Sequence, residues 1–252
     1  MASIINASTT STSGLVQTAD ASGVLQLQSN GVTGLTVGTG GLLTAANGIV
    51  MSSMSLGAAT TGELEYDGGE LYFTPLGTQR GLIPNLQYYR LNSTVAGANA
   101  ATSQSALGVG VTVSASTVYE FKGRYYLTRT AGTTSHVVGT TFGGTATGNN
   151  ILYRAAMKYN TTAISLAATS DVYTAYSFGF NSVLGLITTS GATVYIVVDV
   201  EGTISINAGG TIIPQYNLSA APGGAYTSGI GSYFAIWPVG AAGSNVSVGS
   251  WA

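Results

Sequence analysis

Apolar and polar residues alternate along much of the chain with the two-residue period of a β-strand, and helical periodicity is almost absent. The clearest stretch is 118–128, because its two sets of alternate positions differ sharply in polarity. One set is Tyr119, Phe121, Tyr125 and Leu127, and the other is Glu120, Lys122 and Arg124. This pattern predicts an antiparallel strand with one buried face and one solvated face.

Residues 85–252 repeat such strands with Gly-rich turns between them. A buried strand is predicted at Thr193–Val200, with a turn at Glu201–Gly202 and a return strand through Ile204 and Ile206. Further strands are predicted at 211–218, after a turn at 207–210, at 232–239, and at the chain end, where Trp251 is expected to pin the last residues. Many short strands at this spacing predict an antiparallel β-sandwich of jelly-roll type, the head.

Residues 58–84, the connector, contain the strongest local signal for a β-hairpin. Leu64 and Tyr66 alternate with acidic residues, and Leu71 and Phe73 resume the same period after the turn at 67–69. Pro75 and Pro84 follow the hairpin, and proline cannot donate to a sheet ladder. The connector is therefore predicted to be a clasp that precedes the head.

Residues 1–57, the N-terminal segment, consist of short apolar alternations broken by glycine turns, with Asp20 as the only charged residue. Strands this short cannot enclose a core within one chain. Three copies around a shared axis would bury the apolar positions and cover the open sheet edges. We expect a trimeric stalk or an anchoring segment here, with a flexible Gly/Ser/Thr-rich linker as the alternative.

Composition narrows the function classes. Charged residues make up 6% of the 252 residues, against about 25% in an ordinary soluble domain, while 45% are hydrophobic, so a packed core is expected. The net charge of −2 with scattered Lys and Arg argues against nucleic acid as a partner. No apolar run is long enough for a membrane-spanning helix, and no secretory signal is visible, so no membrane insertion is expected. The absence of cysteine excludes disulfides and thiolate chemistry.

Candidate catalytic groups are few. The single histidine, His136, could form a triad with a serine and Asp171 or Asp199, but no Gly-x-Ser-x-Gly elbow accompanies it. A hydrogen-bonded strand histidine is the favoured interpretation. A glycosidase needs two carboxylates, for which the head offers only Glu120, Asp171, Asp199 and Glu201. Asp199 and Glu201 share a strand face, but we expect them to end that strand in solvent.

Glu63, Glu65 and Asp67 stand at alternate positions with Glu70 nearby, so an extended backbone would place three carboxylates on one face. Hard cations such as Ca²⁺ favour such oxygen clusters. The favoured alternative is a solvated hairpin face, or one that meets an arginine such as Arg80 from a neighbouring subunit. No catalytic, cofactor or metal site is therefore assigned.

Exposed tyrosines can stack on sugars, and the candidates are Tyr88–Tyr89 and Tyr173–Tyr176. Tyrosines of this kind more often belong to a core or a subunit interface. A contact with a host-surface glycan or protein stays open on this basis.

A family resemblance rests on eight short segments: Ser13–Thr18, Ser22–Gln28, Gly62–Gly68, Leu71–Thr74, Val118–Phe121, Gly132–His136, Phe142–Thr147 and Gly231–Phe234. Through the first two, the N-terminal segment is similar to that of many marine and cyanobacterial phage fibre proteins. Through the others, the hairpin and the head resemble those of phage tail or virion appendage proteins. The resemblance implies a non-enzymatic structural role, a trimer and no catalytic residues.

Three hypotheses follow. The first is a homotrimeric fibre or spike, held to other virion proteins by residues 1–57 and presenting the head on the outer surface of the virion after synthesis in the host cytoplasm. The second is a capsid-decorating protein with the same head. The third is a polysaccharide-degrading tailspike enzyme, which the sparse carboxylates of the head do not favour.

Overall fold

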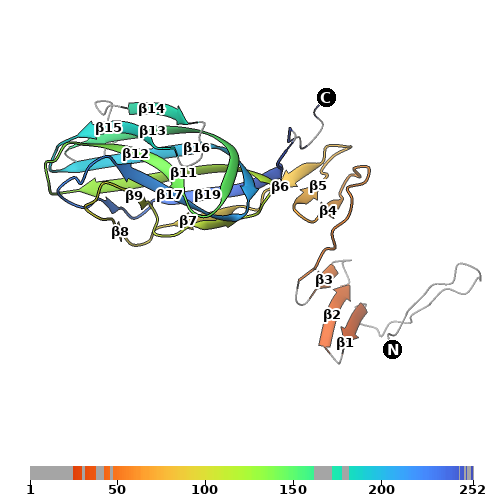
Figure 1. Cartoon of the computed structure of the whole chain (residues 1–252). Helices are drawn as coiled ribbons and strands as arrows, with labels where there is room; N and C mark the ends of the chain where they lie inside the picture. Colours follow the sequence, from red (N-terminus) through yellow and green to blue (C-terminus); the bar gives the residue numbers. More distant parts are fainter. Residues whose placement is uncertain are drawn as a thin grey trace, which may run out of the picture. The chain divides into compact units, whose positions relative to one another are not determined.

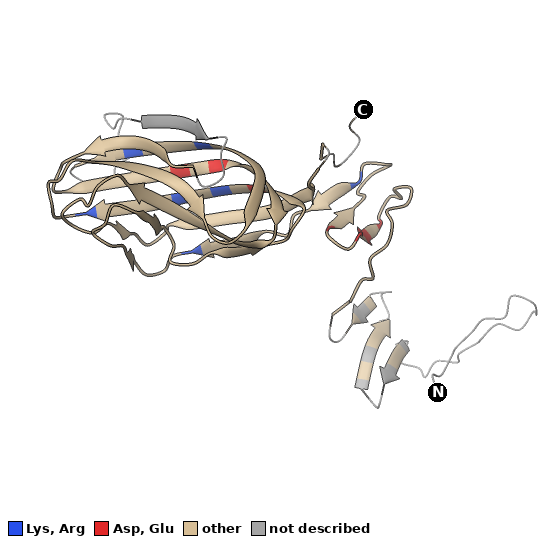
Figure 2. Ribbon diagram, in the orientation of Figure 1, with Lys and Arg blue, Asp and Glu red and all other residues tan. Residues whose placement is uncertain are grey.

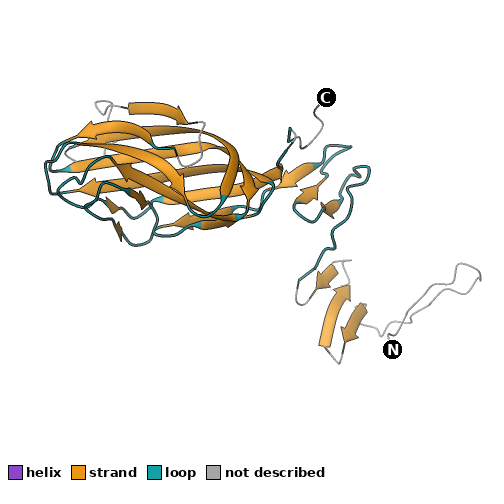
Figure 3. Ribbon diagram, viewed as in Figure 1, coloured by secondary structure: helices purple, strands orange, loops and turns teal. Residues whose placement is uncertain are grey.

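A computed structural model of the chain describes residues 25–29, 32–37, 43–45, 48–161, 172–177, 182–243, 245–246, 248 and 251. Strands form all of the regular structure in these residues, so the predicted all-β fold class is confirmed (Figure 3). The described part of the chain contains no helix that could cross a bilayer. The chain divides into two compact units, 1–52 and 53–252. The domain boundaries expected at 57/58 and 84/85 stay predictions.

The head is a jelly roll, as its strand pairing shows (Figure 1). Strands β10 to β17 pair from the outside inwards, β10 with β17, β11 with β16, β12 with β15 and β13 with β14, so the chain forms one long nested hairpin. Further pairs β12–β17 and β13–β16 roll this hairpin into two sheets. The strands are β10 Val111–Val113, β11 Thr117–Arg129, β12 His136–Gly143, β13 Thr147–Asn160, β14 Val172–Ser177, β15 Leu184–Thr189, β16 Val194–Ala208 and β17 Gly210–Leu218.

Shorter strands extend both sheets. The smaller sheet has the order β10-β17-β12-β15, with β9 Ser103–Ser105 also on β17. The larger sheet has eight strands and begins β14-β13-β16-β11. Beside β11 it is completed by β19 Tyr233–Ala241 with β7 Gln87–Arg90, and by β18 Thr227–Ser228 with β8 Val95–Ala96. The predicted antiparallel sandwich is therefore confirmed.

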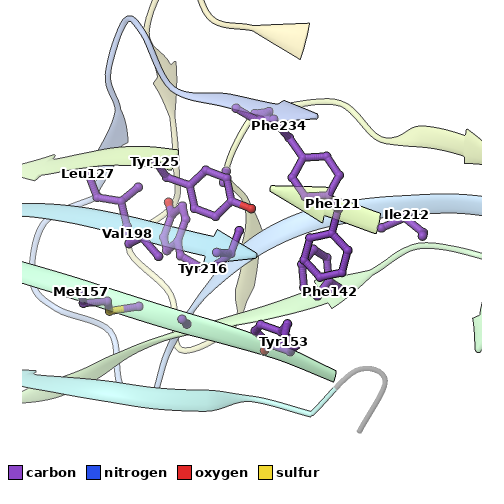
Figure 4. Packing of buried hydrophobic residues seen from close by; sticks show 14 of the residues in the cluster. Phe121, Tyr125, Leu127, Phe142, Tyr153, Met157, Val198, Ile212, Tyr216 and Phe234 are labelled. Carbon is purple, nitrogen blue, oxygen red and sulfur yellow. The ribbon is translucent and has the colours of Figure 1, made fainter. Parts of the chain in front are cut away.

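The core lies between the two sheets, and β11 contributes to it as its alternation predicts. Its apolar set, Tyr119, Phe121, Tyr125 and Leu127, is buried, while Glu120 and Lys122 are exposed. Figure 4 shows Phe121 of the larger sheet beside Phe142 of the smaller one. Their ring centroids are 4.9 Å apart in an edge-to-face arrangement, a geometry that aromatic pairs favour.

The turn predicted at Glu201–Gly202 is wrong, because β16 runs without a break from Val194 to Ala208. Gly202 lies opposite Phe121 on one side and Tyr153 on the other. A Cβ at Gly202 would lie 2.2 Å from the carbonyl oxygen of Leu152, so only glycine fits between these strands. Glycine marks a close approach of backbones here.

Other predictions for the head had mixed outcomes. The turn at 207–210 and the strand at 232–239 are confirmed by the end of β16, the start of β17 and the position of β19. The last strand and its pinned tryptophan are wrong for the described residues, since Trp251 is not in a strand and is 82% exposed. Its indole N–H donates to the carbonyl oxygen of Val248, so its polar atom is satisfied locally without burial of the ring.

The connector hairpin is confirmed and gains a third strand. β4 Leu64–Tyr66, β5 Leu71–Phe73 and β6 Gly81–Ile83 form the three-stranded antiparallel connector sheet. The turn between β4 and β5 needs glycine, because Gly68 has a φ of 101°. Asp67 Oδ1 accepts hydrogen bonds from the N–H groups of Gly69 and Glu70, which closes the turn.

The unit formed by residues 1–52 contains a second three-stranded sheet. Its strands are β1 Leu25–Ser29, β2 Val32–Val37 and β3 Leu43–Ala45, in the order β1-β2-β3. The prediction of short strands in the N-terminal segment is confirmed for these residues. Residues 1–24, which include Asp20, lie outside the described residues.

Candidate binding face of the larger sheet

Half of the 16 charged residues of the chain lie at outward-facing positions of the larger sheet, most of them on β11, β13 and β16, which run side by side. The reason is the alternation of these strands, which turns every second residue away from the core. Figure 2 shows the resulting blue and red bands on neighbouring strands. The charged residues are Arg90, Glu120, Lys122, Arg124, Arg154, Lys158, Asp199 and Glu201.

Two ion pairs connect these strands. Arg124 lies opposite Asp199 in the ladder, and its Nε is 2.6 Å from Asp199 Oδ1. Arg154 lies opposite Glu201, with its Nε 3.0 Å from Glu201 Oε1. The hydrogen bond to Asp199 raises the pKa of Arg124, so this guanidinium is charged at any pH at which the fold exists. The pairs are partly exposed, and each contributes about 0 to 1 kcal/mol to stability.

A polar groove of about 240 Å³ crosses this face and is lined by both ion pairs, Lys122 and Tyr233. At one end of it, Tyr233 stacks on Tyr88 with 5.5 Å between the ring centroids. Tyr88 also lines a mainly apolar cavity of about 270 Å³ at the edge of the sandwich, together with Tyr89 and residues of β10 and β17. An aromatic pair therefore stands between a charged groove and an apolar cavity.

This arrangement includes one of the two predicted aromatic candidates. Tyr88 and Tyr89 are exposed on edge strand β7. Tyr173–Tyr176 fall on β14, whose side chains lie outside the described part of the chain. Tyr233 was missed by sequence reasoning, because only the β7–β19 register places it beside Tyr88 and Arg90.

The prediction of a hydrogen-bonded strand histidine is confirmed. His136 is the first residue of β12 and is buried. Its Nδ1 is 2.8 Å from Thr134 O, and its Nε2 is 2.9 Å from Tyr226 Oη. Both ring nitrogens are therefore engaged by groups other than a serine or a carboxylate. Asp199 cannot complete a triad, since it is paired with Arg124, and Asp171 lies outside the described residues.

Two of the glycosidase candidates are paired with arginines. Asp199 and Glu201 share a face, as predicted, but they stand in the middle of β16, so the expectation that they end the strand is wrong. Asp199 is bonded to Arg124 and Glu201 to Arg154, each on a neighbouring strand. Glu120 lies on β11 opposite Thr203, which is two residues after Glu201 on β16.

The connector carboxylates are held by separate partners. Glu63 Oε2 accepts from the N–H of Thr60, and Glu65 Oε2 lies 2.6 Å from Nε of Arg80. The pairing with Arg80 was anticipated, but it forms within one chain and on the buried side, so the solvated-face prediction is wrong for Glu65. No group of three or more metal-binding side chains occurs in the described part of the chain.

Asp67 and Glu70 differ in their surroundings. Burial acts to raise the pKa of Asp67, but the hydrogen bonds from the N–H groups of Gly69 and Glu70 and from Tyr72 Oη outweigh it, and this pKa is lowered. Burial, with the negative charge of Asp67, raises the pKa of Glu70. The pKa values of these two neighbouring carboxyls are therefore shifted in opposite directions.

A buried arginine was missed by sequence reasoning. Arg129, at the end of β11, is 2% exposed. Its guanidinium donates to four backbone carbonyl groups, those of Ala131, Gly132, Gly191 and Pro222, and lies 5.3 Å from the ring centroid of Tyr226. These bonds fasten three loops at one end of the sandwich. Arg129 is at the right alternation for burial, but its charge argued against that position.

No protein-family model matches the chain, and no curated protein matches it.

Proposed function

We propose that this chain is a structural protein of a bacteriophage particle, a homotrimeric fibre- or spike-type appendage subunit on the outer surface of the virion. Its synthesis in the host cytoplasm and its attachment to other virion proteins through residues 1–57 are part of the same proposal. The support is the sequence resemblance, together with a jelly-roll head that is preceded by small sheets with exposed apolar faces.

The observation that carries the trimer is the apolar face of the N-terminal sheet. The register of β1, β2 and β3 places Leu27, Leu35, Val37, Leu43 and Ala45 on one face. Leu27 is 47% exposed and Leu43 57% exposed, so the residues that the structure describes leave this face partly uncovered. A three-stranded sheet needs a covered apolar face for stability, and sister chains can provide it.

A non-enzymatic role is part of the proposal. The carboxylates that could serve a glycosidase are bonded to arginines on an open sheet face. Hydrolysis of a glycosidic bond needs two carboxyl groups that face the substrate, and these two face arginines instead.

Sedimentation of the full-length chain tests the trimer. We expect a particle of three 25.4 kDa chains. Leu27→Asp should shift the equilibrium to smaller species, because it puts a charge into the proposed interface. Thr36→Asp is the matched control, since Thr36 lies on the opposite face of the same sheet and this variant should stay trimeric. A monomeric full-length chain would contradict the proposal.

Labelling of intact virions tests the location. Antibody against the head should decorate a tail or spike structure in electron micrographs. Labels spread evenly over the capsid shell would favour the capsid-decorating alternative, which the same fold would suit. Absence of the label from purified virions would refute both.

Contact with a host-surface glycan is a second candidate function, favoured by the Tyr88–Tyr233 pair beside the charged groove. Sugars stack on aromatic rings and exchange hydrogen bonds with charged groups, and both are present here. Tyr233→Ala should weaken binding of host polysaccharide about tenfold, as the loss of one stacking contact of about 1 to 1.5 kcal/mol would do. Tyr195→Ala is the control, because Tyr195 is also a strand tyrosine but lines neither the groove nor the cavity. Equal binding by the two variants would remove this function.

A further inference from the structure

The connector sheet buries polar side chains and exposes apolar ones, the opposite of the usual arrangement in a protein sheet. Glu65 on β4 is 2% exposed and Tyr72 opposite it is buried, so the polar and hydrogen-bonding groups are on the covered side. Leu64 and Phe73, which form the next pair in the ladder, are 48% and 40% exposed. Sequence reasoning expected the opposite orientation, with leucine inside and glutamate in solvent.

The strand register extends this exposed side over the whole sheet. Leu64 pairs with Phe73 and Phe73 with Gly81, while Tyr66 pairs with Leu71 and Leu71 with Ile83. Residues directly opposite each other in a ladder share a face. We call this set the connector face, and its members are Leu64, Tyr66, Leu71, Phe73, Gly81 and Ile83.

The covered side explains why the sheet takes this orientation. The Arg80 guanidinium bonds to Glu65 Oε2 through Nε and to the carbonyl oxygen of Gly57 through Nη2. The segment before β4 is also tied to the sheet, since Met54 N–H donates to Tyr66 O and Ser53 Oγ donates to Asp67 O. A buried ion pair broken by a flip of the sheet would leave an unpaired charge, so the orientation is fixed.

We propose that the connector face packs against the same face of sister chains, so that the connector is a subunit interface of the assembled protein. The inference rests on the homotrimer of the proposed function and names a contact surface within it. It goes beyond the N-terminal sheet, since the connector belongs to the other compact unit of the chain.

Charge favours a second copy of this chain as the occupant. The connector face has no charged residue, so identical faces can meet without repulsion between like charges. Three of the four connector carboxylates have partners elsewhere: Glu65 is bonded to Arg80, Glu63 to Thr60, and Asp67 to its own turn. The fourth, Glu70, is buried and is not a member of the connector face. An anionic or cationic partner would find no complementary group on this face.

The size of the strands supports the same occupant. β4, β5 and β6 have three residues each, which is too little to hold a sheet together with one apolar face in water. The N-terminal sheet shows the same design, with apolar residues of three short strands on one exposed face. A chain that leaves two such faces open before its head is built to be completed by copies of itself.

Single-cysteine labelling tests the inference on the full-length chain, which contains no other cysteine. Leu64→Cys and Phe73→Cys report on the connector face. Leu152→Cys is the matched control, because Leu152 is also a strand leucine and is 46% exposed, close to the 48% of Leu64. Each variant is reacted with a maleimide reagent, native and in denaturant, and its mass is measured by sedimentation.

We expect trimers in which Leu64→Cys and Phe73→Cys react at least tenfold more slowly than Leu152→Cys, with equal rates in denaturant. A trimer in which all three cysteines react equally fast would overturn the connector interface and leave the homotrimer standing. A monomeric chain would overturn both. Protection of Leu64→Cys in a monomer would show that the chain covers its own connector face, which also overturns the inference.

Discussion

The head and the connector sheet place their charges on opposite sides. On β11 of the head, Phe121 points into the core and Lys122 into solvent, whereas on β4 of the connector Glu65 is buried and Leu64 is exposed. The head covers its apolar residues with a second sheet of the same chain. The connector has no second layer of its own for the connector face. Local alternation therefore gives two faces to every strand, but the tertiary partner decides which of them is buried.

The largest effect on stability is expected in the core of the head, which two sheets of the same chain enclose. Phe121→Ala should lower the free energy of unfolding of the head by about 3 to 5 kcal/mol, because the cavity cannot collapse between two sheets. Phe121 lies within 7 Å, ring to ring, of Phe142, Tyr153 and Phe234, with centroid distances of 4.9, 6.3 and 5.6 Å. Urea unfolding monitored by tyrosine fluorescence measures the change. Leu152→Ala is the control and should alter stability by about 0.5 kcal/mol or less.

The second effect on stability concerns Arg129, a charged residue that is buried in the head. Arg129→Met should cost about 3 kcal/mol, since four carbonyl groups lose a charged donor in a buried site. The control is Arg154→Met on the outer face, where a partly exposed ion pair contributes about 1 kcal/mol or less. Equal losses in the two variants would mean that the three loops do not depend on Arg129. The same urea titration provides the measurement.

A smaller effect is expected in the connector. Glu65→Gln keeps the shape of the side chain but removes the negative charge beside Arg80, and it should cost about 2 kcal/mol of local stability. Hydrogen exchange of the β4, β5 and β6 amides should speed up, while exchange in the head stays unchanged. Glu63→Gln is the control, because Glu63 has only a backbone N–H as its partner among the described contacts. Faster exchange in the head would mean that the two regions are not independent.

The smallest effect is a pH dependence of the head. Burial lowers the pKa of His136 below 6.5, the positive charge of Arg129 lowers it further, and the hydrogen bond to Thr134 O acts in the opposite direction. As pH falls through about 6.5, the unfolded chain takes up a proton that folded His136 resists, so stability present above that pH is lost on acidification. The His136→Gln variant should lose less stability between about pH 7.5 and 5.5, judged by urea midpoints. An identical pH dependence in both proteins would show that His136 is not responsible.

Sequence patterns predicted the strands and turns whose signal lies in neighbouring residues, such as strands with one buried face and one exposed face. The strand at 118–128 followed from alternation alone, and the hairpin at 62–74 followed from alternation plus the Gly68 turn. The jelly-roll type was anticipated only from the number and spacing of strands. Its nested pairing, such as Val111 with Ile212, joins residues too far apart in sequence for any local pattern to indicate.

The wrong predictions have a common physical cause: each depended on a contact between residues that are distant in sequence. Gly202 resembles a turn glycine after an apolar run, but its lack of a side chain serves the approach of Leu152 and Tyr153. Glu65 resembles a solvated residue, but Arg80 from beyond the next strand pairs with it. The candidate binding face was only half predicted, since Tyr88 is conspicuous in sequence while Tyr233 joins it through the register of β7 and β19.

The nested hairpin also sets the order of events during biosynthesis. The outermost pair of the roll, β10 with β17, cannot form until the ribosome has released residues close to the C-terminal end of the head. Pairing between such distant segments is slow, so the head matures after translation rather than during it. The two small sheets emerge before the head, with Leu27, Leu43 and Leu64 exposed. In the proposed trimer, a folding helper that shields these sheets, or rapid pairing of nascent neighbours on one messenger, would then govern the yield of correctly folded protein.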